Sequence, residues 1–175
     1  MALDPQAIIQ LEDGWKQIET VLLERLERFL ENNNTIELDA DNKAALISNK
    51  EKMECYNVIY KMCTQHAPHN WSEQLYKRHN DRVERYLFAN VLPELEKISP
   101  RRGGVYLLKE LNKRFDNHKR MTKFLQVTFQ YVDRYYVKYH TLPSLKEKCQ
   151  QLFKDIVFDE VCLKVSDAIA GLINL

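Results

Sequence analysis

The chain has 175 residues, which is long enough for one domain with a sizeable core. Its 26 Lys and Arg residues nearly balance 25 Asp and Glu residues, and a net charge of +1 argues against a dedicated nucleic-acid-binding protein, which usually carries a strong basic excess. Only four glycines and five prolines are present, too few for the many turns of an all-β fold. We therefore expect an all-α protein.

Neither a membrane span nor a secretory signal is expected. No apolar run approaches the roughly 18 residues that a spanning helix needs, and the first residues lack the basic start and apolar core of a signal peptide. The four cysteines are not in CxxC spacing, and each lies in a helix-like pattern; they are Cys55, Cys63, Cys149 and Cys162. We expect reduced thiols in the core of a protein of the cytoplasm and nucleus.

The spacing of apolar residues, and the turn-forming residues between them, predict six helices. They cover about residues 5–30, 49–64, 71–97, 105–115, 119–139 and 145–175. Residues 32–49 break the helical pattern, so we expect an exposed linker there. Residues 101–104 are expected to form a turn, and Pro93 to end or kink the third helix. Gly171 is expected to end the last helix or to bend it.

Capping residues mark four of these helix starts. Asp4 offers an N-cap and Pro5 suits the first helical position. At the other three starts a Ser or Asn is followed three residues later by Glu, which is the capping-box signature. These pairs are Ser48 with Glu51, Asn70 with Glu73, and Ser144 with Glu147.

Two of the expected helices are apolar around more of their surface than the stripe of about 100° that a core-facing helix needs. On a helical wheel the apolar residues of helix 49–64 cover roughly 220°, and those of helix 119–139 roughly 200°. Either both helices lie at the centre of a bundle, or each carries a core stripe and a second stripe for a partner. The surplus residues are mainly Tyr, Met and Phe, which favours the second alternative. The second stripes would comprise Met53, Tyr56 and Tyr60 on one helix and Phe124, Val127, Tyr131 and Tyr135 on the other.

No catalytic or metal-binding set of residues stands out. His66 and His69 have HxxH spacing, but no nearby Cys or carboxylate completes a metal site, so we expect a solvated loop. His118 is expected to cap a helix or to hydrogen-bond rather than to catalyse. We therefore expect no catalytic residue, no metal, no cofactor and no enzymatic activity.

Several strings in the right order resemble the N-terminal domain of cullins. Residues 56–64, YNVIYKMCT, are similar to the family's second-helix pattern Y-x-x-[IV]-Y-x-x-C-[TS]. Residues 129–136, FQYVDRYY, are similar to its F-x-Y-[LV]-[DN]-R-[YHF] helix. Further resemblances lie at residues 74–76, 108–119, 142–145 and 153–158. The chain is therefore identified as a member of the cullin family, and it most resembles the Skp–cullin–F-box type.

The resemblance implies a fold and a function. It implies an all-α cullin-repeat bundle, with a first repeat over about residues 6–140 and a following helical segment over about residues 143–175. It also implies a non-catalytic scaffold of a cullin-RING ubiquitin ligase, whose first repeat binds a Skp/BTB-fold adaptor and through it an F-box-type substrate receptor. The family's RING-binding part is C-terminal and is not among these residues. The alternative is a stand-alone cullin-like decoy that sequesters adaptors.

The resemblance also implies the residues of the adaptor-binding face. Carried over residue by residue, the face comprises Lys52, Met53, Tyr56, Tyr60, Tyr131 and Tyr135. Lys52 departs from the family, which usually has an aromatic residue there, and it would shift the preference of the face toward an acidic patch. Neither nucleic acid nor membrane is expected as a partner.

Overall fold

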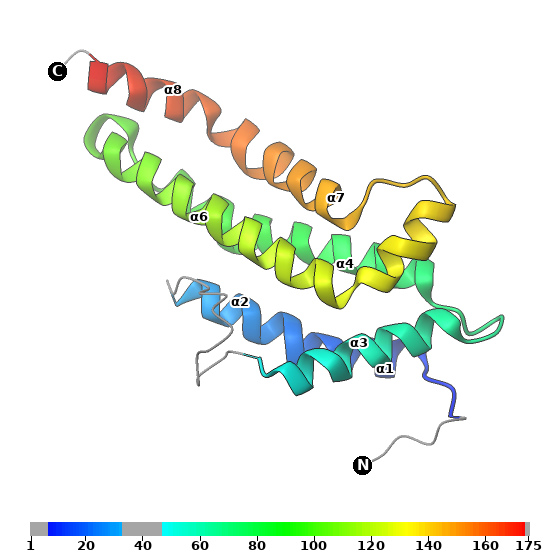
Figure 1. The fold of residues 1–175 in the computed structure, drawn as a ribbon. Coiled ribbons are helices and arrows are strands. Elements are labelled where there is room, and N and C mark those ends of the chain that lie inside the picture. The colour runs from blue at the N-terminus through cyan, green and yellow to red at the C-terminus, as the bar shows by residue number, and fades with distance from the viewer. Residues whose placement is uncertain (1–6, 33–46, 174–175) are drawn as a thin grey trace.

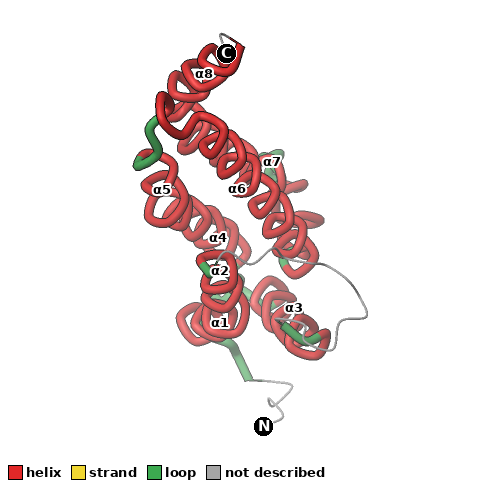
Figure 2. The backbone as a smooth tube through the Cα atoms, turned by 90° about the vertical axis from the view of Figure 1, so that its left-hand side faces the viewer, coloured by secondary structure: helices red, strands yellow, loops and turns green. Residues whose placement is uncertain are grey.

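The computed structural model describes residues 7–32 and 47–173, and all regular structure in these ranges is helical (Figures 1 and 2), as the composition predicts. The elements are α1 (Leu11–Ile18), the π-helical η1 (Glu19–Leu23), α2 (Glu24–Glu31), α3 (Asn49–Thr64), α4 (Ser72–Tyr86), η2 (Leu87–Val91), α5 (Leu92–Glu96), α6 (Pro100–Thr128), η3 (Val132–Val137), α7 (Leu145–Leu152), η4 (Phe153–Phe158) and α8 (Asp159–Ile173). Over the same residues, no helix has the length and apolar character that crossing a membrane requires.

Three stretches of helix each contain one π-helical turn and continue through it: α1–η1–α2, α4–η2–α5 and α7–η4–α8. The turn η2 ends two residues before Pro93, which has no N–H to donate to the carbonyl four residues back. The kink expected at Pro93 is therefore absorbed as a widened turn. The long helix α6 packs against α3 on one side and against α7 and α8 on the other (Figure 1).

Two of the predicted capping boxes are confirmed. In each, the Ser Oγ accepts a hydrogen bond from the Glu backbone N–H at 3.2 Å, and Glu Oε2 accepts one from the Ser backbone N–H at 2.8 Å. They start α3 at Ser48–Glu51 and α7 at Ser144–Glu147. Each box satisfies backbone donors that the first turn of a helix leaves without an intrahelical partner.

The third predicted box is wrong. Asn70 Oδ1 accepts a hydrogen bond from the backbone N–H of Ser72 at 3.1 Å, but Glu73 returns none and binds Lys77 instead. The reason is the register of the helix start. Helix α4 begins at Ser72, so Glu73 is its second residue and cannot take the third-position role that the box requires.

The first helix begins later than predicted, at Leu11; Asp4 and Pro5 lie outside the described residues. Residues 7–10 are not helical because tertiary hydrogen bonds occupy the backbone of Ile9. Its N–H donates to Gln65 Oε1 at 2.6 Å, and its carbonyl oxygen accepts from Gln65 Nε2 and Trp71 Nε1, both at 3.0 Å.

The linker predicted over residues 32–49 lies mostly outside the described residues, but its end contradicts the prediction. Ile47 is 1% exposed and belongs to the hydrophobic core. The segment that leads into α3 is therefore anchored by an apolar side chain directly before the Ser48 cap.

The helices predicted at 105–115 and 119–139 are not separated at residues 115–119. Helix α6 runs through this junction to Thr128, and the rest of the second predicted helix follows after Phe129 as η3. The turn predicted at 101–104 lies inside α6. The turn becomes a kink at Gly103, with φ −139° and ψ 30°. No glycine or proline lies between residues 105 and 142, and the expected junction is buried. There His118 Nε2–H donates to the carbonyl oxygen of Cys149 at 2.8 Å, which confirms its hydrogen-bonding role. The helix instead breaks at Phe129, with φ −92° and ψ 12°. At the C-terminal end, α8 continues through Gly171 to Ile173.

The core joins the first helical stretch to α4. Trp15 is buried, and the guanidinium of Arg78 in α4 lies 5.8 Å from the centroid of its ring. All four cysteines are free thiols; three are buried as predicted, whereas Cys162 is half-exposed. A Cβ at Gly14 would overlap Met62 Sδ, so α1 and α3 pack closely here and a larger residue would require the Met62 side chain to shift.

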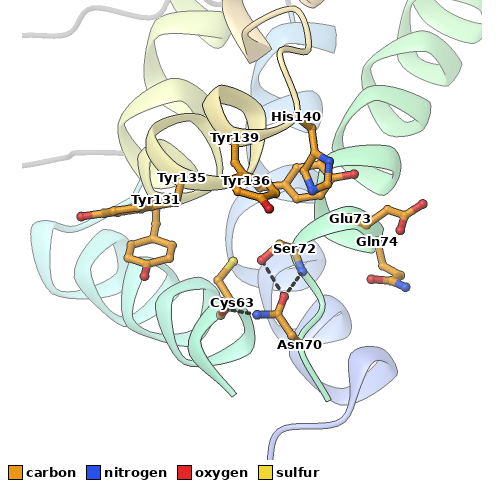
Figure 3. Close-up of a pocket in the computed structure, with 10 residues that line it drawn as sticks. All are labelled: Cys63, Asn70, Ser72, Glu73, Gln74, Tyr131, Tyr135, Tyr136, Tyr139 and His140. Atoms are coloured by element: carbon orange, nitrogen blue, oxygen red, sulfur yellow. Dashed lines mark hydrogen bonds between the residues drawn. The ribbon is translucent and has the colours of Figure 1, made fainter. Parts of the chain in front are cut away.

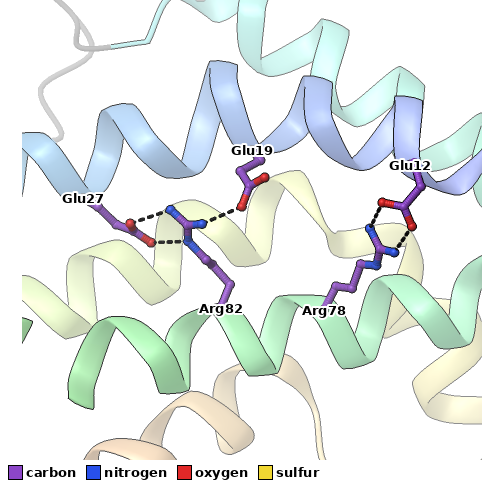
Figure 4. Close-up of polar contacts among 5 residues, drawn as sticks. All are labelled: Glu12, Glu19, Glu27, Arg78 and Arg82. Carbon is purple, nitrogen blue, oxygen red and sulfur yellow. Dashed lines mark hydrogen bonds and ion pairs between the residues drawn. The ribbon is translucent and has the colours of Figure 1, made fainter. Parts of the chain in front are cut away.

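Carboxylates of the first helical stretch bind arginines of α4 (Figure 4). Arg82 pairs in a fork with Glu27, through Nε–Oε1 and NH2–Oε2 contacts of 2.7 Å, and it also donates to Glu19 at 2.5 Å. Arg78 pairs with Glu12 in the same way. These contacts link the first helical stretch to α4 at two points along its length.

Candidate protein-binding face

The apolar residues of α3 divide into a buried stripe and an exposed one. The buried stripe consists of Cys55, Val58, Ile59, Met62 and Cys63. On the other stripe Met53 and Tyr60 are exposed, Tyr60 to 45%, and Tyr56 is half-buried. This arrangement favours the second of the two alternatives left open by periodicity, a core stripe plus a second stripe.

The helical stretch after residue 119 divides in the same way. Met121, Leu125, Phe129 and Val132 are buried. Val127 and Tyr135 are exposed, Tyr135 to 58%, whereas Phe124 and Tyr131 are partly buried and pack against the core. Neither helix is therefore buried on most of its sides.

Four tyrosines join the two exposed stripes; we call Tyr56, Tyr60, Tyr131 and Tyr135 the tyrosine row. Tyr56 stacks on Tyr60 with ring centroids 6.5 Å apart. Tyr60 meets Tyr131 edge to face at 5.0 Å, and Tyr131 contacts Tyr135 at 4.4 Å. Consecutive ring contacts therefore connect α3 to residues 131–135, the helical segment that follows α6.

The other two predicted site residues lie beside the row. Lys52 places its Nζ 4.9 Å from the centroid of the Phe124 ring, a cation–π contact that also links α3 to α6. Met53 is exposed on α3. The structure thus brings Lys52 and all four tyrosines to the junction of the two helices, with Met53 at the edge.

The face is largely uncharged. Burial, then the neighbouring Tyr135 and Tyr60, raise the pKa of the Tyr131 hydroxyl above its usual value, which disfavours a charge on the face still further. Behind the row, burial raises the pKa of the Cys63 thiol to about 11. An apolar ring surface with hydroxyl tips and one lysine suits docking of another protein better than chemistry.

A pocket of about 480 Å³ adjoins the end of the row (Figure 3); we call it the tyrosine pocket. Its lining residues are Cys63, Asn70, Ser72, Glu73, Gln74, Tyr131, Tyr135, Tyr136, Tyr139 and His140. Tyr136, Tyr139 and His140 were not among the site residues predicted from the sequence. The signal was present for Tyr139, which follows Tyr135 at i+4 and so lies one helical turn further along the same face.

Within residues 7–32 and 47–173 no group of three or more His, Cys, Asp or Glu side chains could hold a metal ion. The two histidines of the HxxH pair have different surroundings. His66 is exposed, whereas the ring of His69 packs edge to face against Trp71 at 5.9 Å.

The fold and the face define an all-α helical protein with an aromatic surface across two helices. Residues 18–175 match a family model described as the cullin alpha solenoid domain. The chain is 34% identical over 174 residues to Cullin-1 of Oryza sativa subsp. japonica, covering 99% of this chain and 22% of that protein. It therefore belongs to the cullin family, as its resemblance indicated.

Two Arabidopsis thaliana proteins are also similar over most of the chain. Putative cullin-like protein 1 is 32% identical over 167 residues, which are 95% of this chain and 21% of that protein. Putative cullin-like protein 2 is 31% identical over 168 residues, which are 95% of this chain and 41% of that protein. The chain thus spans about a fifth of the length of the rice protein and of the first Arabidopsis protein.

Proposed function

We propose that this chain is the adaptor-binding region of a non-catalytic cullin scaffold in a RING-type ubiquitin ligase. It binds a Skp/BTB-fold adaptor, which in turn carries a substrate receptor such as an F-box protein. The RING protein binds elsewhere on the complete scaffold. The assembly acts in ubiquitin-dependent degradation in the cytoplasm and nucleus.

The observation that carries this proposal is the tyrosine row. Its rings come from two helices and touch one another, yet Tyr60 and Tyr135 stay about half exposed. Tyrosines are enriched in the centres of protein interfaces because a large apolar ring and a polar tip can both be satisfied there. Lys52 and Met53 flank the row and complete the proposed adaptor-binding face.

The test is an affinity measurement by isothermal titration calorimetry, with a purified Skp-fold adaptor and, separately, a purified BTB protein. Truncation of an aromatic anchor at an interface centre typically costs about 2–4 kcal/mol, or roughly 30- to 1,000-fold in affinity. We therefore expect Tyr56→Ala combined with Tyr131→Ala to abolish measurable binding.

The matched control is Tyr106→Ala, because Tyr106 is an exposed tyrosine near the other end of α6. It should bind like the unmodified chain. Tyr131 packs partly on the core, so the helical circular dichroism of the double variant must be retained for its result to count. Equal binding by the folded double variant, or no binding of either adaptor by the unmodified chain, would overturn the proposal.

A decoy that sequesters adaptors is the second candidate. It is favoured by one observation: the same aligned region makes up 41% of Putative cullin-like protein 2, so a relative of this kind is much shorter than the rice cullin. Both candidates use the same face. Co-purification of a RING protein with the native full-length protein supports the scaffold, whereas adaptor without RING protein supports the decoy.

A further inference from the structure

The tyrosine pocket is continuous with the proposed adaptor-binding face, because Tyr131 and Tyr135 belong to both. Beyond Tyr135 the ring contacts resume around His140. Its imidazole lies 4.5 Å from the ring of Tyr136 and 5.0 Å from that of Tyr139. Figure 3 shows these rings above the start of α4, with Glu73 and Gln74 at the right of the view, on the far side of Tyr136 and His140 from Tyr135.

The outermost rings of the pocket contribute little to the hydrophobic core. Tyr139 is 85% exposed, and His140 is exposed as well. A tyrosine ring this open to water, next to others that are half-exposed, is available to a partner at small cost to folding.

The lining of the pocket has the electrostatic character of a cation site. None of the ten residues is Lys or Arg. The faces of tyrosine rings carry negative potential, and Glu73 adds a carboxylate. Glu73 is ion-paired with Lys77 at 2.5 Å, and this hydrogen bond, more than the charge of His140, lowers the pKa of Glu73 and keeps it ionised; Lys77 itself is not part of the lining, so an incoming cation would share Glu73 with Lys77.

We propose that the tyrosine pocket receives an arginine or lysine side chain of the adaptor docked on the neighbouring tyrosine row. This inference rests on the proposed function and adds a specificity element to it. The cation stacks on the exposed rings of Tyr135 and Tyr139, with Glu73 as its counter-charge. Removing a ring should therefore weaken binding of the cation, because the ring faces attract it. Added salt should also weaken binding, because it screens the charge of the carboxylate.

The experiment measures the affinity of a purified Skp-fold adaptor for three variants of this chain. Tyr139→Ala should weaken binding about three- to tenfold, whereas Tyr139→Phe, which keeps the ring face, should bind within about twofold of the unmodified chain. Glu73→Gln should weaken binding about threefold and reduce its dependence on salt concentration.

Two matched controls lie away from the pocket. Tyr106→Ala removes another exposed tyrosine, and Glu94→Gln removes another exposed carboxylate that is paired with a lysine, Lys97. Both should leave the affinity unchanged. In double-mutant cycles, the effect of Glu73→Gln on affinity should be non-additive with alanine replacement of one basic residue of the adaptor. It should be additive with replacement of each of the adaptor's other basic residues.

The outcomes separate the two proposals. If the unmodified chain binds the adaptor and the Tyr56→Ala, Tyr131→Ala variant does not, the proposed function stands. If Tyr139→Ala and Glu73→Gln then bind like the unmodified chain, the pocket inference alone is wrong. Loss of affinity that Tyr139→Phe shares with Tyr139→Ala would also overturn it, because the ring face would not be what matters. If the unmodified chain binds no adaptor, both the proposed function and the pocket inference are wrong.

Discussion

Tyr60 of α3 meets Tyr131 of the helix after α6 edge to face, with ring centroids 5.0 Å apart and ring planes at 88°. This geometry sets the electropositive edge of one ring against the electronegative face of the other. The contact joins two exposed stripes into one surface, so neither stripe alone is the candidate binding face.

Adjacent residues of α3 should respond oppositely to truncation. Ile59 is fully buried, so Ile59→Ala should lower the free energy of unfolding by about 2–5 kcal/mol. Tyr60→Ala loses only ring contacts at the surface and should cost about 1 kcal/mol. Urea denaturation followed by circular dichroism measures both. Equal losses would mean that the tyrosine row is part of the core.

Removal of Arg82 should destabilise the fold. Arg82→Ala leaves Glu19 and Glu27 without their common partner in a partly buried position, at a cost of about 1–3 kcal/mol in the free energy of unfolding. The matched comparison is Lys77→Ala, which breaks an exposed pair with Glu73 and should change stability by no more than about 0.5 kcal/mol. The Arg82 idea fails if urea titrations give the two variants the same midpoint.

Stability should fall as the pH drops from about 6.5 toward 4. Burial lowers the pKa of His79 and of His118 to about 4, against the usual value of 6.5; hydrogen bonds to Asn80 and to the Cys149 carbonyl oppose this only partly. Between these values the unfolded chain binds more protons than the folded one, so acid favours unfolding by up to about 1.4 kcal/mol per pH unit for each histidine. Urea titrations at about pH 7.5 and about pH 5 measure the loss.

The variant His118→Gln isolates one of these groups. Whatever its effect at neutral pH, its stability should depend less steeply on pH between about 6.5 and 4.5. A hydrogen bond from Arg25, followed by those from Ser48, lowers the pKa of Glu51 to about 2. Glu51 therefore does not contribute to the pH dependence between about 6.5 and 4.5, because its stabilisation is fully present above about pH 4.5 and is lost only below it. An unchanged pH slope in the variant would contradict the assignment to His118.

The four cysteines should differ in reactivity under native conditions. Burial raises the pKa of Cys55, Cys63 and Cys149 to about 11, so their thiolates are scarce as well as inaccessible. Cys162 is half-exposed and should react first with a thiol reagent such as DTNB, while the others react only in denaturant. Mass spectrometry of the labelled protein locates the modified residue. Fast native labelling of a buried cysteine, or a disulfide in the isolated protein, would contradict this prediction.

The helix periods and two capping boxes could be predicted from the sequence because they are local. A Ser–Glu box depends on residues three apart, and a buried stripe on residues three and four apart. The same periodicity placed Met53, Tyr56 and Tyr60 on one exposed stripe. Their connection to Tyr131 and Tyr135 came only from the family resemblance, because the crossing of two helices does not follow from the pattern of either one.

What the sequence by itself determined is the all-helical class and which face of each helix is apolar, since both follow from composition and short-range spacing. The tertiary structure decided the rest. Helix α6 runs through the junction predicted at residues 115–119 because Asn117 and His118 are buried there and His118 hydrogen-bonds to α7. The first helix begins only at Leu11 because Gln65 and Trp71 hold the backbone of Ile9. Both outcomes depend on contacts between residues distant in the chain, and the conformational preference of a local segment does not determine such contacts.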